Sequence, residues 1–167
     1  MAGPAADAFE WAAALTHEAT AGRVLDVGCG EGRFLPPGGV GLDLDAARLA
    51  RARDRSALIV RADAHALPFR DATFDTVYAH RVLNDAGRVD HVLGEIARVL
   101  RTQGRLLLFT RARHGDGDRL DRWNGEARLR DRFEHVAAEL HPTDERAAFF
   151  RAERPRVTAG ATASGPR

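Results

Sequence analysis

The chain has 167 residues, a hydrophobic fraction of 44%, a charged fraction of 29% and a formal net charge of +1. This length suits one domain with a hydrophobic core, and the near-neutral charge gives no overall field that would attract nucleic acid. The chain has no run of about 18 apolar residues that would indicate a membrane span, its N-terminus does not resemble a secretory signal, and its single cysteine fits a reducing cytoplasm.

Along residues 5–112, the apolar pattern predicts helices that alternate with strands. A helix over 5–20 comes first, with Phe9, Trp11, Ala12 and Leu15 on its apolar face. Further helices are expected over 45–53, capped by Asp45, and over 86–101, and strands over 23–28, 39–45, 57–63, 73–80 and 104–112. Apolar strands that alternate with helices indicate a parallel sheet covered on both faces.

The last third of the chain has a different pattern. Residues 120–133 predict a helix, and residues 134–142 and 145–155 predict two strands that a short turn should pair antiparallel. Residues 156–167 have no apolar period and should be a disordered tail, which leaves residues 1–155 as a single domain.

The connection between the first two strands is unusual. Only residues 31–35 could form a helix there before the sequence PPGG ends it. The connecting helix should therefore be about one turn long or missing, although a parallel crossover usually needs a dozen or more residues.

A glycine loop follows the first predicted strand. The segment VLDVGCGEGRF, residues 24–34, has glycines at positions 28, 30 and 32 directly after an apolar run that contains Asp26. Glycine permits backbone torsions barred to other residues, and ligands of open parallel sheets bind beyond the carboxyl ends of the strands. A dinucleotide fingerprint fails because Arg33 occupies the place of its third glycine, and a Walker-type loop fails because the chain has no lysine. Asp26 and Glu31 would repel a pyrophosphate, so a ligand with a positive centre, such as S-adenosylmethionine, fits better.

Two more acidic residues end the following strands. Asp43, at the end of the second strand, could accept both ribose hydroxyls of such a ligand, and each hydrogen bond to a charged group contributes about 1.5–3 kcal/mol. Asp63, at the end of the third strand, could accept from the adenine amine, and the amide of Ala64 could donate to the adjacent ring nitrogen. Each acid alone could equally cap a helix or lie in a solvated loop. Together, in this order, they favour a ligand.

Four segments resemble class I S-adenosylmethionine-dependent methyltransferases of the small methyltransferase-domain type: VLDVGCGEGRF, GVGLDLD, ADAHALPFRDATFDTVYAH and EIARVLRTQGRLLLF. They lie within residues 20–112 in the family's order and spacing, and the two C-terminal strands resemble the family's terminal hairpin. The resemblance implies a Rossmann-like, doubly wound α/β sheet of seven strands in the order 3-2-1-4-5-7-6, with the seventh antiparallel. It also implies S-adenosylmethionine as cofactor and S-adenosylhomocysteine as product.

The resemblance further implies which residues bind the cofactor. Those at its methionine end are Asp26, Gly28, Cys29 and Gly30, those at its ribose and adenine are Asp43, Leu44, Asp63 and Ala64, and those beside the transferring methyl are Ala79 and His80. The chain departs from the family in its short first connection, in RTQG at positions 101–104 where a Pro-Gly-Gly turn is usual, and in lacking an insertion long enough for a substrate lid.

Candidate catalytic residues come next in the chain. His80 could act as a general base, or it could simply satisfy a backbone group at a strand end. Asn84 and Asp85 could orient an acceptor or form part of a magnesium site, or they could cap the next helix; no metal is expected. His114 and Trp123 follow the fifth strand, where this family often binds acceptors, but Trp123 is expected to be a packed aromatic.

The sequence thus favours a cytoplasmic methyltransferase that acts on a small molecule by in-line transfer. Methylation of RNA or protein and a cofactor-binding partner subunit without catalysis remain open, as does a homodimer. A membrane partner is not expected. A nucleic-acid partner is not expected either, because the arginine-rich stretch 111–132 is interleaved with Asp and Glu.

Overall fold

The computed structural model of the chain describes residues 7–52, 58–85, 87–115 and 117–156. The tail expected to be disordered therefore lies, except for residue 156, outside the described residues. None of the described helices is long and apolar enough to span a bilayer.

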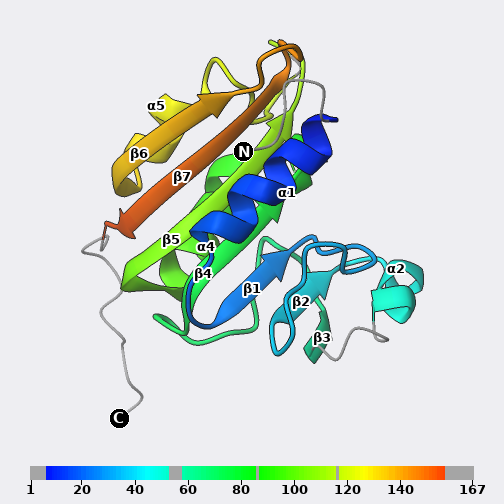
Figure 1. Cartoon of the computed structure of the whole chain (residues 1–167). Helices are drawn as coiled ribbons and strands as arrows, with labels where there is room; N and C mark the ends of the chain where they lie inside the picture. Colours follow the sequence, from blue (N-terminus) through cyan, green and yellow to red (C-terminus); the bar gives the residue numbers. More distant parts are fainter. Residues whose placement is uncertain (1–6, 53–57, 86, 116, 157–167) are drawn as a thin grey trace.

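One sheet of seven strands organises the molecule, in the order β3-β2-β1-β4-β5-β7-β6 (Figure 1). Its strands are β1 (Val24–Val27), β2 (Val40–Asp43), β3 (Leu58–Arg61), β4 (Phe74–His80), β5 (Leu100–Arg111), β6 (Phe133–Leu140) and β7 (Ala147–Pro155). The first five strands run parallel, and β7 is antiparallel to both of its neighbours. The predicted strand order and the antiparallel seventh strand are confirmed.

Helices cover both faces of this sheet. They are α1 (Ala8–Ala19), α2 (Ala46–Ala52), α3 (Val82–Asp85), α4 (Val89–Val99) and α5 (Gly125–Arg130). In Figure 1, α1 crosses the near face over β4 and β5, while α4 lies behind the sheet. The buried side chains of α4 recur at helical spacing, as the sequence predicts: Val89, Val92, Leu93, Ile96 and Val99.

Two hydrophobic clusters hold these layers together. The larger cluster joins the sheet to α4 and α5 and includes Val77, Ile96 and Leu129. The smaller cluster joins the other face to α1 and includes Ala12 and Phe149. The sheet is therefore buried on both sides, which explains why its central strands read as continuous apolar runs.

Two predicted element boundaries differ in the structure, and one predicted helix cap is present. The predicted helix over 120–133 is only α5, because the side chain of Asp121 accepts from the amides of Trp123 and Asn124 (both 2.8 Å) and holds a turn there. Residues 101–104 lie within β5, which begins directly after α4, and do not form a separate turn. The capping role of Asp45 at α2 is confirmed, since its Oδ1 accepts from the amides of Ala47 and Arg48.

The first connection has no helix, as the sequence predicts. Residues 28–39 form successive turns between β1 and β2, which nevertheless pair in parallel. The N-terminal helix α1 and the side chain of Phe34 cover this part of the sheet and belong to the smaller cluster.

Candidate functional site

The glycine loop wraps tightly around the carboxyl end of β1. Gly28, Gly30 and Gly32 all adopt left-handed backbone conformations, with φ of +72°, +55° and +74°. The amides of Gly28 and Cys29 both donate to the carbonyl of Leu42, at 2.7 and 3.0 Å. A Cβ at Gly28 would lie 2.8 Å from Cβ of Val82, so both torsion and space require glycine there.

Asp26 is the most unusual group at this edge. It is 1% exposed, and neither carboxylate oxygen has a hydrogen-bond partner among the described residues. Burial first, and then the nearby charge of Asp43, raise its pKa from 3.8 to about 8. A buried carboxylate without a partner is costly in free energy, so a cationic ligand group that reached it would be bound strongly.

Asp43 connects the glycine loop to the end of β2. Its Oδ2 accepts from the amide of Gly30 at 2.8 Å, and its Oδ1 accepts from the amide of Asp45 at 2.9 Å. The next residue, Leu44, is 62% exposed although it is a large apolar side chain. A carboxylate with free lone pairs beside an exposed leucine could bind hydroxyls and cover a flat ring.

Asp63 lies just beyond β3 and is engaged by His65. Its Oδ1 is 2.7 Å from the ring nitrogen Nδ1 of His65 and accepts from that residue's amide at 2.9 Å. These two hydrogen bonds lower the pKa of Asp63, and the one from the amide has the larger effect. The pKa of His65 is raised, first by the contact of its Nε2 with the carbonyl of Gly87 and second by the hydrogen bond to Asp63. The Asp63 side chain remains 55% exposed and so open to a ligand.

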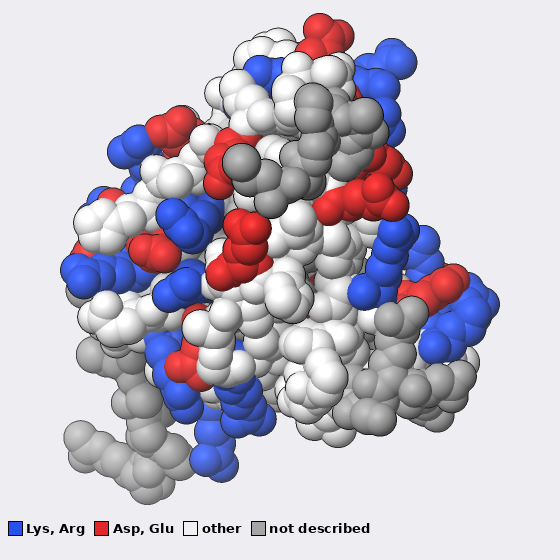
Figure 2. Space-filling model, in the orientation of Figure 1, with Lys and Arg blue, Asp and Glu red and all other residues white. Residues whose placement is uncertain are grey.

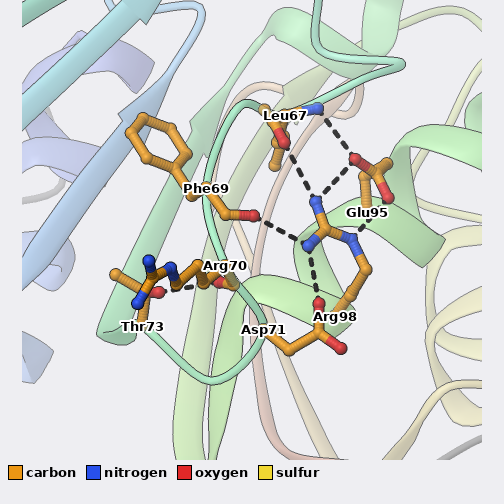
Figure 3. A network of polar contacts seen from close by, with 7 residues as sticks. All are labelled: Leu67, Phe69, Arg70, Asp71, Thr73, Glu95 and Arg98. Atoms are coloured by element: carbon orange, nitrogen blue, oxygen red, sulfur yellow. Dashed lines mark hydrogen bonds and ion pairs between the residues drawn. The ribbon is translucent and has the colours of Figure 1, made fainter. Parts of the chain in front are cut away.

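Arg98 anchors the loop that precedes β4 (Figure 3). Arg98 on α4 donates to the carbonyls of Leu67 (3.0 Å) and Phe69 (2.8 Å) and to the carboxylates of Glu95 and Asp71 (2.7 Å each at the shortest contact). Glu95 in turn accepts from the amide of Leu67 at 2.8 Å. The network fixes the loop on the helix behind the sheet.

His80, at the end of β4, is enclosed by α1 and Phe34. Its Nε2 lies 2.8 Å from the hydroxyl of Thr16, and its ring stacks on Phe34 with centroids 4.2 Å apart. Because the single hydroxyl proton of Thr16 is donated to the carbonyl of Ala12, Nε2 of His80 must be the donor, and Nδ1 carries the lone pair. Nδ1 is buried without a partner, and burial lowers the pKa of the ring to about 3.

His80 and Asp26 belong to neighbouring strand ends. Asp26 pairs in register with Tyr78, two residues before His80, and its charge also raises the pKa of Tyr78, after burial. Ala79, between Tyr78 and His80, is fully buried in the larger cluster. Cys29 is buried, and burial followed by the charges of Asp26 and Asp43 raises its thiol pKa to about 12, so it remains a packed thiol.

The side chain of Asn84 is buried against β5. Asn84 is 7% exposed, with Oδ1 3.0 Å from the hydroxyl of Thr110, which also lies 2.5 Å from the carbonyl of Leu120. Asp85 is the last residue of α3. Asn84 does not cap α4, because the N-cap residue of that helix is Arg88 and its first amide, at Val89, donates to the side chain of Asp118 (3.0 Å). The side chain of Asp85 lies outside the described part of the chain. In the described part of the chain, no three His, Cys, Asp or Glu side chains gather to hold a metal ion.

His114 and Trp123 lie beyond the end of β5 in a groove of about 830 Å³, which reaches to the turn between β6 and β7. Trp123 is 51% exposed, so the prediction that it is a packed aromatic is wrong. The two rings are 5.0 Å apart, and His114 Nδ1 lies 3.3 Å from Asp121 Oδ2. On the face in Figure 2, basic and acidic side chains are interspersed.

Some neighbours of the site were not predictable from sequence. Thr16 and Phe34 reach His80 only through the tertiary fold, and Asp118 is 29 residues from Val89. The contact of Asp63 with the amide of His65 could have been predicted, since an Asp side chain often accepts from the amide two residues later in an Asx turn.

Comparison with known proteins identifies the family of the chain. The model of the family described as "Methyltransferase domain" matches residues 25–108. The chain is similar to a fatty-acid O-methyltransferase of Mycolicibacterium smegmatis (41% identity over 54% of this chain and 37% of the relative). It is also similar to a 27-O-demethylrifamycin SV methyltransferase of Amycolatopsis mediterranei (37% identity, 52% and 37%) and a malonyl-[acyl-carrier protein] O-methyltransferase of Legionella pneumophila (35%, 53% and 36%). The chain thus spans little more than a third of the length of these three curated relatives.

Solved structures agree on the fold. A protein from Pyrococcus horikoshii OT3 superposes with a TM-score of 0.68 at 19% identity and covers 86% of each chain. A structure described as an S-adenosylmethionine-dependent methyltransferase from Thermotoga maritima gives a TM-score of 0.67 at 18% identity, over 87% of this chain and 88% of that one. At such identities the likeness concerns the fold alone.

Proposed function

Because the chain belongs to the family of S-adenosylmethionine-dependent methyltransferases that carry the methyltransferase domain, we propose that it transfers a methyl group to a small-molecule acceptor. The observation that carries the proposal is the pair of buried, unpartnered oxygens of Asp26 beside a glycine loop. An ammonium group is the chemical complement of such a carboxylate, and the methionine end of the cofactor has one.

The remaining cofactor contacts follow the edge of the sheet. Gly28, Cys29 and Gly30 would face the methionine part, and Asp43 with Leu44 the ribose and adenine. Asp63 and Ala64 would bind the adenine edge, while Ala79 and His80 would border the methionine end. The free lone pairs of Asp43, the exposed apolar surface of Leu44 and the exposed carboxylate of Asp63 support these roles.

The bound cofactor supplies a methyl group on a positively charged sulfur, which leaves as a neutral thioether. The protein's contribution is then mainly positioning, which can supply about 7–11 kcal/mol of the barrier. We propose His80 as a positioning residue, because its hydrogen bond to Thr16 and its pKa of about 3 make it a weak base near neutral pH. Asn84 and Asp85, on α3 directly after β4, would border the acceptor side, and the hydroxyl of Thr110 fixes the Asn84 side chain there.

The acceptor is proposed from the relatives and the edge of the site. The names of three relatives specify a fatty acid, 27-O-demethylrifamycin SV and malonyl-[acyl-carrier protein]. Two of these acceptors are small molecules, and the described chain offers an open groove beside β5 that could admit one. RNA and protein acceptors are alternatives that the assay below would reveal.

The test combines binding with transfer. Calorimetry should show S-adenosylhomocysteine binding, with no comparable binding of NAD, and a radiolabelled methyl group should move from S-adenosylmethionine to a component of a small-metabolite extract. Asp26→Asn should reduce both, whereas Arg70→Gln, an exposed change in the loop before β4, should reduce neither. Cofactor binding without transfer to metabolites, RNA or protein would support the non-catalytic partner subunit instead, and no cofactor binding would refute the proposal.

A further inference from the structure

The groove beyond β5 has a defined place in the fold. In the sheet, Phe109 pairs with His80, and Arg111, two residues further along β5, begins the groove. Two strand residues advance the chain by only about 7 Å, so the groove opens beside the strand end to which His80 belongs. Its opposite wall is the turn between β6 and β7, which includes Asp144 and Arg146.

The groove has an aromatic wall, Trp123, which stands on an ordered turn. The amide of Trp123 donates to Asp121 Oδ1 at 2.8 Å, and the amide of Asp121 donates to Asn124 Oδ1 at 3.0 Å. Asp121 itself is 2% exposed, so the turn beneath the indole is locked. Arg122 lies over the indole at 5.5 Å. The backbone beneath the half-exposed indole is thus ordered, and the ring surface left between its contacts with Arg122 and His114 could stack on a flat group.

Some charged side chains in the groove have partners within the protein and others do not. The guanidinium of Arg111 pairs with Asp144 at 2.5 Å, and Asp144 also accepts from the amide of Arg146, so this carboxylate is already bound. Arg113 makes no hydrogen bond or ion pair with any other described residue, although it is exposed in the groove. Glu145 is the one charge there that opposes an incoming anion without an ion pair among the described residues.

From this arrangement we propose that the groove is the acceptor subsite and takes a flat aromatic carboxylate. The ring would stack on Trp123, and the carboxylate would bind the guanidinium of Arg113. This inference rests on the proposed methyltransferase function, because it assigns the acceptor end of the same edge of the sheet. The carboxylate of Glu145 would weaken binding of the anion by repulsion.

The indole signals of the two tryptophans offer a direct test. In a nitrogen–proton correlation spectrum each indole N–H gives one peak, and Trp123→Phe identifies that of Trp123. Titration with 2-naphthoate should shift the Trp123 peak and leave that of Trp11, on α1, in place. The neutral 2-naphthamide should bind about three- to tenfold more weakly, because it lacks the charge.

Three matched variants test the charges separately. Arg113→Gln should weaken naphthoate binding about three- to tenfold, and Glu145→Gln should strengthen it about two- to fivefold, while Arg70→Gln should leave it unchanged. An unmoved Trp123 peak at saturating naphthoate, equal binding of the amide, or an Arg113→Gln effect no larger than that of Arg70→Gln would each overturn the proposal.

The same samples distinguish this proposal from the wider one. S-adenosylhomocysteine binding by calorimetry, together with an unmoved Trp123 peak, would overturn the subsite and leave the methyltransferase proposal standing. Naphthoate binding without any S-adenosylhomocysteine binding would refute the methyltransferase proposal and, with it, the assignment of the groove to an acceptor. Both ligands bound at once, with the Trp123 shift retained, is the expected result.

Discussion

Replacing Asp26 by asparagine should stabilise the protein and impair its cofactor site. Asparagine has nearly the same shape and no charge, so the variant removes the buried carboxylate without leaving a cavity. With a pKa raised from 3.8 to about 8, the folded protein keeps a proton that the unfolded chain releases at any pH between these values. The free energy of unfolding therefore falls as pH rises through that range, by up to about 1.4 kcal/mol per pH unit, and is unaffected by this group below it.

At pH 7 this cost reaches about 4 kcal/mol if the site does not relax. Relaxation and water entry reduce the cost of buried charges, so we expect Asp26→Asn to be more stable by about 2–4 kcal/mol at pH 7. The advantage should shrink towards pH 4, where the unfolded wild type also begins to bind the proton. Because a ligand ammonium would lose its partner, S-adenosylhomocysteine should bind about 10- to 100-fold more weakly.

Urea unfolding of wild type and variant at several pH values between about 4 and 8 measures the effect. The difference between the two proteins isolates Asp26, since His80, whose pKa burial depresses to about 3, contributes equally to both. Asp7→Asn, at the exposed cap of α1, is the control and should change little, because asparagine also caps helices. A variant no more stable than wild type at pH 7, with an unchanged dissociation constant, would refute the reasoning.

Three further predictions concern the roles of Asp43, His80 and Arg98. Asp43→Ala should weaken S-adenosylhomocysteine binding in calorimetry by about 2–4 kcal/mol, because ribose contacts and the hydrogen bond from Gly30 are both lost; an unchanged constant would place the ribose elsewhere. The methyl-transfer rate should show no titration near pH 6.5, since His80 stays neutral; a rise there that His80→Ala abolishes would make it a base. Arg98→Ala should lower the free energy of unfolding by about 2–4 kcal/mol in urea, with the exposed Arg130→Ala as control, and an equal effect of both variants would contradict the anchoring role.

The sequence predicted the sheet well because its signals there are local and repeated. Apolar runs in alternation with helical periodicity identified the strands and α4. The short segment before PPGG limited the first connecting helix to about one turn or none, and the structure has none. Boundaries failed where one side chain overrode the pattern, as when Asp121 holds a turn before α5. Propensity alone cannot foresee such a contact.

The site was predictable at the strand ends and not beyond them. Asp26 and Asp43 follow from position along the strands, and the structure brings them to one edge with the glycine loop. The surroundings of His80 depend on Thr16, 64 residues earlier in the chain, a contact that no local pattern specifies. Trp123 could be located in sequence, but its exposure depends on how the turn beneath it folds.

The way α1 is packed has a consequence for the order of folding. This helix is made before β7, yet its Trp11 packs beside Phe149 of β7 and near His141, with ring centroids 6.4 and 5.2 Å apart. Contacts so distant in sequence form late, because the chain between them must first be ordered. We therefore expect α1 to pack on the sheet only after β7 has left the ribosome, so that Thr16 reaches His80 only once β7 has joined the sheet.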